Sequence, residues 1–440
     1  MRVAIIGAGV AGLNAARVLV ERGADVTLLE ASDRVGGRIR TVYPSDGGLP
    51  IELGPEFVHG DPELTRALAN VELEEIRERH HLWHDGRIVE LGDLWDRFGR
   101  VLSQVGGTDE SARAYLERIA PRADDAALFT RFIEGFYGAD LDDISIAGVA
   151  ADAGGAGGSG SPAQYRVRGG YARLVESLTA RLAHVDLHLG CVVHRVDHRS
   201  HPTVVELWHG ARRSTVTADA VIVTVPLGVL LARTIHFEPG LGERERMFGK
   251  LAMGQVVKLV VRLREPVWRD HDLTTVDFLH ADDTGFPTYW LRSGGGTHLL
   301  TAWAGGPHAR RLAELSASAL VERAIAGFAT TVGVSRAGVA AAVVDLHRYD
   351  YVHDPYTRGA YSYARVGAGD TALELARPID NTLFFAGEVT DPELEGTVIG
   401  ALASGARVAD EVLRGPRPHL VEAPERHADA RHLRHHAPPR

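Results

Sequence analysis

Cysteine is almost absent from this chain, whose 440 residues include only Cys191. An intramolecular disulfide framework is therefore excluded, as is a cysteine cluster for zinc or iron–sulfur chemistry. Cys191 precedes two valines, so we expect a small buried residue. Long apolar runs are also missing, since none reaches the roughly 18 residues that a membrane span needs. The N-terminus has no basic, cleavable signal, and we predict a cytoplasmic protein without a membrane partner.

Basic character is lacking as well, because the formal net charge is −10. This charge argues against nucleic acid as the main partner and suits a cationic substrate. The hydrophobic content of 45% indicates buried cores rather than disorder. A chain of this length is long enough for about two to three domains.

The first thirty residues have the pattern of a dinucleotide-binding unit. An apolar strand over residues 3–6 leads into Gly7, Gly9 and Gly12, a helical periodicity follows, and a second strand over 26–29 ends at Glu30. Gly7 allows a tight turn, Gly9 lets the backbone approach a pyrophosphate, and Gly12 lets the helix pack closely on the strand. The carboxylate of Glu30 can accept hydrogen bonds from the ribose hydroxyls, which disfavours NADP. A purely structural glycine turn is the alternative, and the strand, helix and acid around the motif argue against it.

Apolar strands and helical segments alternate through the middle of the chain, which predicts a parallel sheet. We expect a helix over residues 171–182, and later β-rich segments predict a second sheet. The strands are expected over 185–189, 191–196, 204–208 and 220–225, and those of the second sheet over 256–263 and 297–303.

Two segments are expected to lack regular structure. Residues 154–161 read G-G-A-G-G-S-G-S, which is typical of a mobile loop or linker. From about Arg414 the chain is rich in proline, histidine and arginine without apolar periodicity, which predicts a disordered tail. The tail histidines alternate with arginines and have no scaffold that would fix their geometry, so we predict no metal site.

The residues after the second strand point to one family. Residues 34–38 (R-V-G-G-R) with Thr41 resemble the G-G-R-x-x-T signature of the flavin-containing amine oxidase superfamily. The resemblance implies that the dinucleotide is FAD, with Gly36 and Gly37 close to the flavin and Arg38 at its phosphate. A glycine turn beside a surface arginine would explain the tripeptide G-G-R at residues 36–38, but not the match of the whole segment from Arg34 to Thr41.

A second tract strengthens this resemblance. Residues 218–230 (A-D-A-V-I-V-T-V-P-L-G-V-L) are similar to the segment of polyamine oxidases and lysine-specific histone demethylases where the chain leaves the FAD domain. Residues 254–261 (G-Q-V-V-K-L-V-V) and Trp268 resemble the strand that carries the family's active-site lysine, which implies that Lys258 holds a water against flavin N5. The alternative is an edge-strand lysine with its ammonium in water. Lys250 is a rival in the same tract.

The C-terminal third adds a third match. Residues 354–363 (D-P-Y-T-R-G-A-Y-S-Y) resemble the family's substrate-side aromatic segment, and residues 383–388 (L-F-F-A-G-E) resemble its second FAD signature, with Gly387 and Glu388 facing the ribityl chain. Residues 395–401 (E-G-T-V-I-G-A) open the last helix near Thr397, and its positive end suits the flavin pyrimidine, where charge accumulates on reduction. We assign Val398 and Val193 as further FAD contacts.

Departures from the family refine the site. Monoamine oxidases have a flavin-bonding cysteine at the position of Ala360 and a second cage tyrosine at that of Thr397, so we expect non-covalent FAD and a half-built aromatic cage with Tyr361 as its wall. Residues 52–60 (E-L-G-P-E-F-V-H-G) resemble the E-L-G-x-x-W-I-H-G stretch of polyamine and spermine oxidases. Gly54 is therefore an expected FAD contact and His59 a candidate substrate contact, with a structural role for His59 as the alternative.

The resemblance covers residues 1 to about 413, with a weak match over 76–165. It implies an α/β (α+β) fold in which a Rossmann-like FAD-binding domain carries a substrate domain built on a mixed sheet flanked by helices. We predict an FAD-binding domain of residues 1–75, 166–240 and 345–413, a substrate domain of 76–165 and 241–344, and a tail of 414–440.

The function that follows is an FAD-dependent amine oxidase of the polyamine-oxidase type, which uses oxygen and produces hydrogen peroxide. The catalytic candidates are Lys258, Tyr361, His59 and Thr397. The alternatives are an L-amino acid oxidase, a monoamine oxidase or a carotenoid-type desaturase of the same fold, a chromatin-binding demethylase, and a non-catalytic FAD-binding redox module. Candidates for holding a distal ammonium group are Glu117, Glu134, Asp140 and Asp142.

Overall fold

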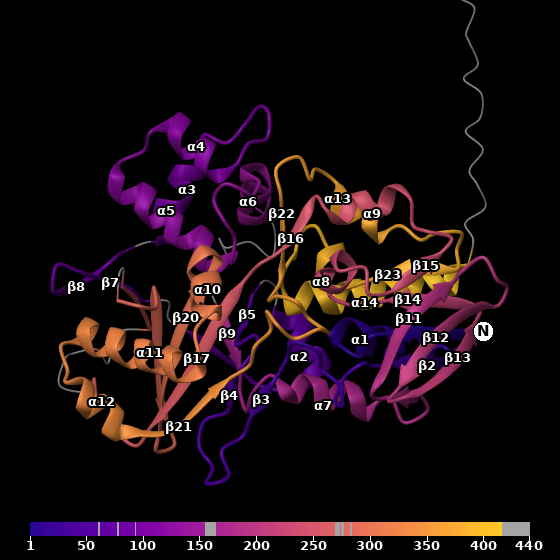
Figure 1. Ribbon diagram of the computed structural model, residues 1–440, viewed down its shortest axis with the longest axis horizontal. Helices are drawn as coiled ribbons and strands as arrows, with labels where there is room; N and C mark the ends of the chain where they lie inside the picture. Colours follow the sequence, from indigo (N-terminus) through magenta and orange to yellow (C-terminus); the bar gives the residue numbers. More distant parts are fainter. Residues whose placement is uncertain are drawn as a thin grey trace, which may run out of the picture.

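The structure is a computed structural model that describes residues 1–59, 62–76, 79–92, 94–154, 164–268, 273, 277–281 and 284–415. Nearly all of the predicted loop at 154–161 and nearly all of the predicted tail lie outside the described residues, so both stay predictions. No helix in the described part is long and apolar enough to cross a membrane. Figure 1 shows two large sheets at opposite ends of the molecule with a group of helices above them.

A five-stranded parallel sheet occupies the end of the molecule that holds the N-terminus (Figure 1). Successive residues of its central strand β1 face opposite sides, as the period of two in a strand requires. Val3 and Ile5 join one core cluster, whereas Ala4 and Ile6 join another. In spatial order the strands are β10 (Asp186–His188), β2 (Asp25–Leu29), β1 (Arg2–Ile6), β14 (Ala220–Val223) and β23 (Leu383–Phe385).

Helices cover one face of the parallel sheet. They are α1 (Val10–Glu21), α7 (Ala172–Ala180) and α14 (Val398–Arg414). The close packing of α14 on α1 depends on Gly405, since a Cβ there would lie 2.3 Å from the carbonyl oxygen of Ala11. The strand–helix–strand unit predicted for the first thirty residues is thus confirmed, and so is the predicted helix after residue 171.

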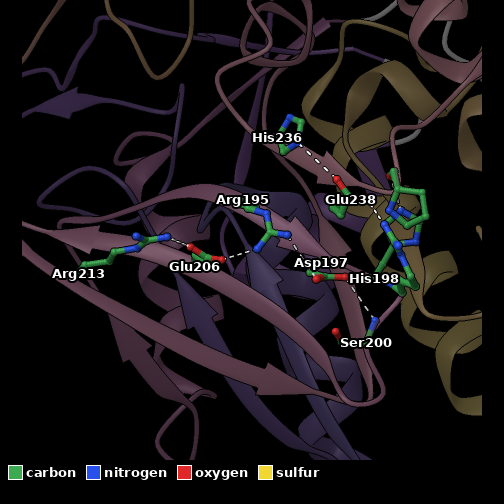
Figure 2. A network of polar contacts seen from close by, with 10 residues as sticks. Arg195, Asp197, His198, Ser200, Glu206, Arg213, His236 and Glu238 are labelled. Atoms are coloured by element: carbon green, nitrogen blue, oxygen red, sulfur yellow. Dashed lines mark hydrogen bonds and ion pairs between the residues drawn. The ribbon is translucent and has the colours of Figure 1, made fainter.

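A four-stranded sheet covers the opposite face of the parallel sheet. Its order is β13 (Arg212–Ala218), β12 (Thr203–His209), β11 (Cys191–Asp197) and β15 (His236–Glu238). Figure 2 shows the polar network that ties these strands together, in which Glu206 of β12 pairs with Arg195 of β11 and Arg213 of β13. None of the labelled residues lines the cavity described below.

The seven-stranded sheet at the other end is mixed, because β18 and β7 pair in parallel and the other neighbours pair antiparallel. In spatial order it contains β21 (Val343–Arg348), β17 (Val256–Leu263), β20 (Thr297–Gly305), β19 (Thr288–Gly294), β18 (Phe278–Ala281), β7 (His80–His84) and β8 (Arg87–Glu90). The helices α10 (Gly306–Ala313), α11 (Ala317–Val332) and α12 (Arg336–Ala342) pack on one face. Val257 and Leu259 point into that packed face, so Lys258 between them points to the other.

The remaining elements are helices and short strands outside these three sheets. The upper group of helices in Figure 1 comprises α3 (Leu94–Leu102), α4 (Ala112–Ile119), α5 (Ala123–Phe136) and α6 (Ile146–Gly154). The other helices are α2 (Pro62–Ala69), α8 (Leu227–Leu231), α9 (Glu243–Phe248), α13 (Thr371–Ala376) and the 3-10 helix η3 (Glu388–Thr390). The short strands are β3 (Thr41–Val42), β4 (Ile51–Glu52), β5 (Phe57–Val58), β6 (Leu73–Ile76), β9 (Gln164–Val167), β16 (Leu251–Met253) and β22 (Ser362–Ala364).

The predicted fold class is confirmed: a Rossmann-like parallel sheet is joined to a second, mixed sheet flanked by helices. The strand predicted over 256–263 matches β17 residue for residue. The residue bounds proposed for the two domains stay a prediction.

Candidate active site

The glycine motif forms a turn that brings backbone to the edge of a cavity. Gly7 has a φ of +108°, in the region that favours glycine. A Cβ on Gly12 would lie 2.0 Å from the Gly7 carbonyl oxygen, so helix α1 can approach β1 only with glycine there. A Cβ on Gly9 would meet nothing within 4 Å, and Gly9 lines the cavity. The turn therefore leaves open space at the N-terminus of α1, where backbone N–H groups can bind a pyrophosphate.

Glu30 directly follows β2, beside this turn. Its side chain accepts hydrogen bonds from the Ala8 backbone N–H at 2.7 Å and from the Ser32 hydroxyl at 2.7 Å, and it lines the cavity. Cys191 and Val193 lie at the same end, where the Cys191 N–H donates to the Glu30 carbonyl oxygen at 2.8 Å. Cys191 is small and 4% exposed, as expected, and it also lines the cavity, which the sequence did not indicate.

The G-G-R-x-x-T string crosses directly over this turn. A Cβ on Gly37 would lie 3.1 Å from the Gly9 Cα, so the two glycine segments touch. Gly36, with a φ of +101°, also lines the cavity. The Thr41 hydroxyl donates to the Glu52 carboxyl at 2.7 Å, which gives the last residue of the motif a structural role. Burial raises the pKa of Glu52 to about 7.

Glu388 connects the two FAD signatures. One carboxylate oxygen accepts from Arg38 at 2.9 Å, and the other accepts from the Ser362 hydroxyl at 2.6 Å and from the Gly396 N–H at 3.1 Å. Gly387 has a φ of +133° and open space where a Cβ would be, so the backbone there faces the cavity. Arg38 and Glu388 thus neutralise each other, and their contacts to phosphate and ribityl groups stay predictions.

Thr397 caps the last helix. Its hydroxyl accepts from the Gly400 N–H at 2.9 Å and donates to the Leu394 carbonyl oxygen at 2.8 Å. The hydroxyl donates once and accepts once at the helix start, so Thr397 has a capping role, and its role in catalysis stays a prediction. Val398, the first residue of α14, lines the cavity next to this N-terminus.

One cavity of about 620 Å³ joins these segments, a volume within the range of roughly 300–1,000 Å³ typical of ligand sites. Gly12 is not among the lining residues, in keeping with its role in helix packing. The predicted site residues that do line the cavity are Gly7, Gly9, Glu30, Gly36, Gly37, Arg38, Gly54, His59, Val193, Lys258, Tyr361, Gly387, Glu388, Thr397 and Val398.

Lys258 is held by a buried carboxylate that the sequence did not reveal. Its ammonium group donates to Glu56 at 2.9 Å and to the Gly54 carbonyl oxygen at 3.3 Å. Glu56 also accepts from Arg166 at 3.0 Å and from the Trp290 indole at 3.1 Å. Burial opposes ionisation of Glu56, but the charges of Lys258 and Arg166 outweigh it and lower the pKa of Glu56 to about 2.

This arrangement excludes the edge-strand explanation of Lys258. Strand β17 lies between β20 and β21, and the Lys258 side chain is only 4% exposed. Lys250, its rival, is exposed and does not line the cavity. An ammonium group has three N–H donors, and two of them have acceptors among the described residues, while the Trp290 ring lies 5.3 Å from the ammonium; one donor can therefore serve a water or a ligand.

Aromatic side chains enclose the cavity near Lys258. The Tyr361 hydroxyl donates to the Phe136 carbonyl oxygen at 2.6 Å, and burial raises the pKa of Tyr361. His59 meets Phe136 edge-on, with ring centroids 5.4 Å apart. Trp303 also lines the cavity and donates to the Gly135 carbonyl oxygen at 2.9 Å. His59 and Trp303 thus line the cavity together with Tyr361, and the half-built cage with Tyr361 as its wall stays a prediction.

The acidic residues proposed for a distal ammonium lie elsewhere. Glu117 is exposed, and Glu134 pairs with His308 at 3.4 Å. Asp140 pairs with Arg310 and Asp142 with Arg113, both at 2.6 Å. None of the four lines the cavity, which contradicts this use of them. Two acids that do line it, Asp152 and Glu395, were not singled out.

Comparisons with known proteins agree with this geometry. A family model described as "Flavin containing amine oxidoreductase" matches residues 10–99 and 90–413. The chain is 30% identical to lysine-specific histone demethylase 1 homolog 3 of Arabidopsis thaliana over 94% of its own length, but spans only 30% of that protein. It is 29% identical to polyamine oxidase 3 of Oryza sativa subsp. japonica, with 92% of this chain and 88% of that one covered.

Solved structures share the fold. A putrescine oxidase bound to putrescine superposes with a TM-score of 0.79 at 20% identity, covering 94% of this chain and 99% of that one. Cyclohexylamine oxidase from Brevibacterium oxydans IH-35A gives a TM-score of 0.77 at 19% identity, covering 94% of this chain and 98% of that one.

Proposed function

The chain belongs to the flavin-containing amine oxidoreductase family, and we propose that it oxidises a C–N bond of a polyamine-like amine to imine and then aldehyde, with oxygen as acceptor and hydrogen peroxide as product. FAD, when bound, supplies the two-electron chemistry by taking a hydride from the carbon next to the amine nitrogen. The observation that carries the proposal is that a single cavity joins the glycine turns to the aromatic wall and Lys258.

The residues fit this cofactor. The open spaces at Gly9 and Gly387 allow close backbone approach, Glu30 lies where ribose hydroxyls would bind, and the N-terminus of α14 faces the cavity at Val398. At the reacting end, Tyr361 and Trp303 exclude water and orient the substrate, and Lys258 can hold one water. Glu56 offsets part of the positive charge of Lys258 and Arg166 at this end, and the amine nitrogen that reacts is neutral.

A substrate screen tests the proposal. A polyamine must present one neutral nitrogen for oxidation, so the rate should rise with pH through the ionisation of that amine. We expect kcat/KM for a polyamine to exceed that for a monoamine of similar length by at least about 10-fold, since a charge-assisted hydrogen bond contributes roughly 1.5–3 kcal/mol. The measurement is anaerobic flavin bleaching followed by oxygen-coupled turnover.

The same screen separates the alternatives. Arg131 lines the cavity from α5 and is the kind of residue that an amino acid carboxylate needs, so L-amino acids belong in the assay. A better rate with an L-amino acid or benzylamine would show the polyamine assignment to be wrong while the oxidase assignment survives. If no amine or amino acid reduces the bound flavin, the non-catalytic FAD-binding redox module would be the function that remains.

FAD should be bound without a covalent link. Ala360 lines the cavity and has no nucleophilic atom, while Cys191 lies beside Glu30, where its N–H donates to the Glu30 carbonyl oxygen. We expect acid precipitation of the purified protein to release all yellow colour into the supernatant. Flavin absorbance that stays with the denatured pellet would contradict this prediction.

A further inference from the structure

Seven carboxylates line the cavity, and most are already engaged. Glu30, Glu56 and Glu388 accept the hydrogen bonds described above. Asp354 accepts from the Tyr349 hydroxyl at 2.7 Å and from the Tyr356 N–H at 2.8 Å, and Asp33 is exposed to solvent. The two that remain are Asp152 and Glu395.

Asp152 and Glu395 have no cationic partner in the described part of the chain. Asp152, near the end of α6, accepts one hydrogen bond, from the Tyr137 hydroxyl at 2.6 Å. Glu395 lies just before α14, and its Oε1 is buried with no hydrogen-bond partner among the described residues. A buried carboxylate oxygen without a hydrogen-bond partner is costly, and it marks a place where a ligand can complete the contacts.

We propose that Asp152 and Glu395 together form a subsite for the distal ammonium group of a diamine or polyamine substrate. The subsite rests on the proposed amine oxidation and names the end of the substrate that does not react. The two residues come from different elements: α6 belongs to the upper helices in Figure 1 and lies beside β22, while Glu395 precedes the yellow helix α14.

The electrostatics of the cavity favour this assignment. Burial raises the pKa of Asp152 to about 6. Burial, and then the charges of Glu388 and Asp152, raise the pKa of Glu395 to about 8. An ammonium group bound beside the two carboxylates would relieve their repulsion, whereas Lys258 and Arg166 already place two positive charges on the single carboxylate of Glu56. A diamine is therefore oriented with its charged end at Asp152 and Glu395.

Matched substrates and variants test the subsite in the FAD-bound enzyme. Each α,ω-diamine of three to six carbons is compared with the n-alkylamine that has a methyl group in place of the second amine. The selectivity is the ratio of kcat/KM for the diamine to kcat/KM for the alkylamine. We expect Asp152→Asn and Glu395→Gln each to lower this ratio at least about 10-fold, mainly through KM for the diamine. Asp142→Asn, an acid outside the cavity, should leave the ratio within about two-fold of wild type.

The outcomes separate the two proposals. A wild-type enzyme that oxidises neither amine refutes the proposed function, and the subsite with it. A wild-type enzyme that prefers diamines, with the same ratio in both cavity variants, refutes the subsite alone. Flavin absorbance of each variant is recorded, and if Glu395→Gln loses FAD, the ratio for Asp152→Asn decides.

Discussion

Replacing Glu56 by alanine is expected to lower the free energy of unfolding by about 3–5 kcal/mol, because it leaves buried cations without their counter-charge. The side chains of Lys258, Arg166 and Glu56 are 4%, 11% and 9% exposed, so the lost carboxylate leaves two largely buried cations. Glu56→Gln should cost less, since the amide oxygen still accepts one of the three donors. The measurement is urea unfolding at a fixed excess of FAD, followed by tryptophan fluorescence.

The control for Glu56 is Glu322→Ala, which removes a carboxylate that is 69% exposed and pairs with Arg336. That change should alter stability by less than about 0.5 kcal/mol. The effect of Glu56 should also depend on pH. Its pKa falls from an ordinary value of 4.5 to about 2 in the folded protein, so its contribution is complete above pH 4.5 and is lost as the pH falls towards 2. A loss below about 1 kcal/mol at neutral pH would show that the three groups are not held as a buried unit.

The cofactor end of the cavity could be predicted because its chemistry is local in sequence. Gly7, Gly9 and Gly12 act within one turn, and Glu30 reaches the Ala8 N–H only 22 positions away. Such contacts need only a strand, a turn and a helix in order, which apolar periodicity reveals. The motifs at Gly37 and Gly387 lie far apart in the chain, and only their resemblance to the family predicts that both belong to this end of the cavity.

The substrate end was less predictable because it depends on packing between distant segments. Glu56 stands at a variable position of a matched string, and its partners Lys258 and Arg166 are 202 and 110 positions away. Asp152 and Trp303 come from elements whose relative placement no periodicity specifies. Asp152 lies in the weakly matched segment 76–165, where no signature marks it, and the acids predicted there for the distal ammonium do not line the cavity.

Lys258→Met is expected to retain FAD while slowing flavin reduction or reoxidation by at least about 10-fold, or ~1.4 kcal/mol on the affected barrier. Methionine has nearly the length of lysine, so the substitution removes the ammonium group and changes the packing little. Glu56 still accepts from Arg166 and Trp290, so its charge stays compensated. This makes Lys258→Met a sharper test of chemistry than any change at Glu56. Stopped-flow absorbance of both half-reactions measures the effect, with the exposed Lys250→Met as control. Unchanged rates in both half-reactions would leave Lys258 as a structural partner of Glu56.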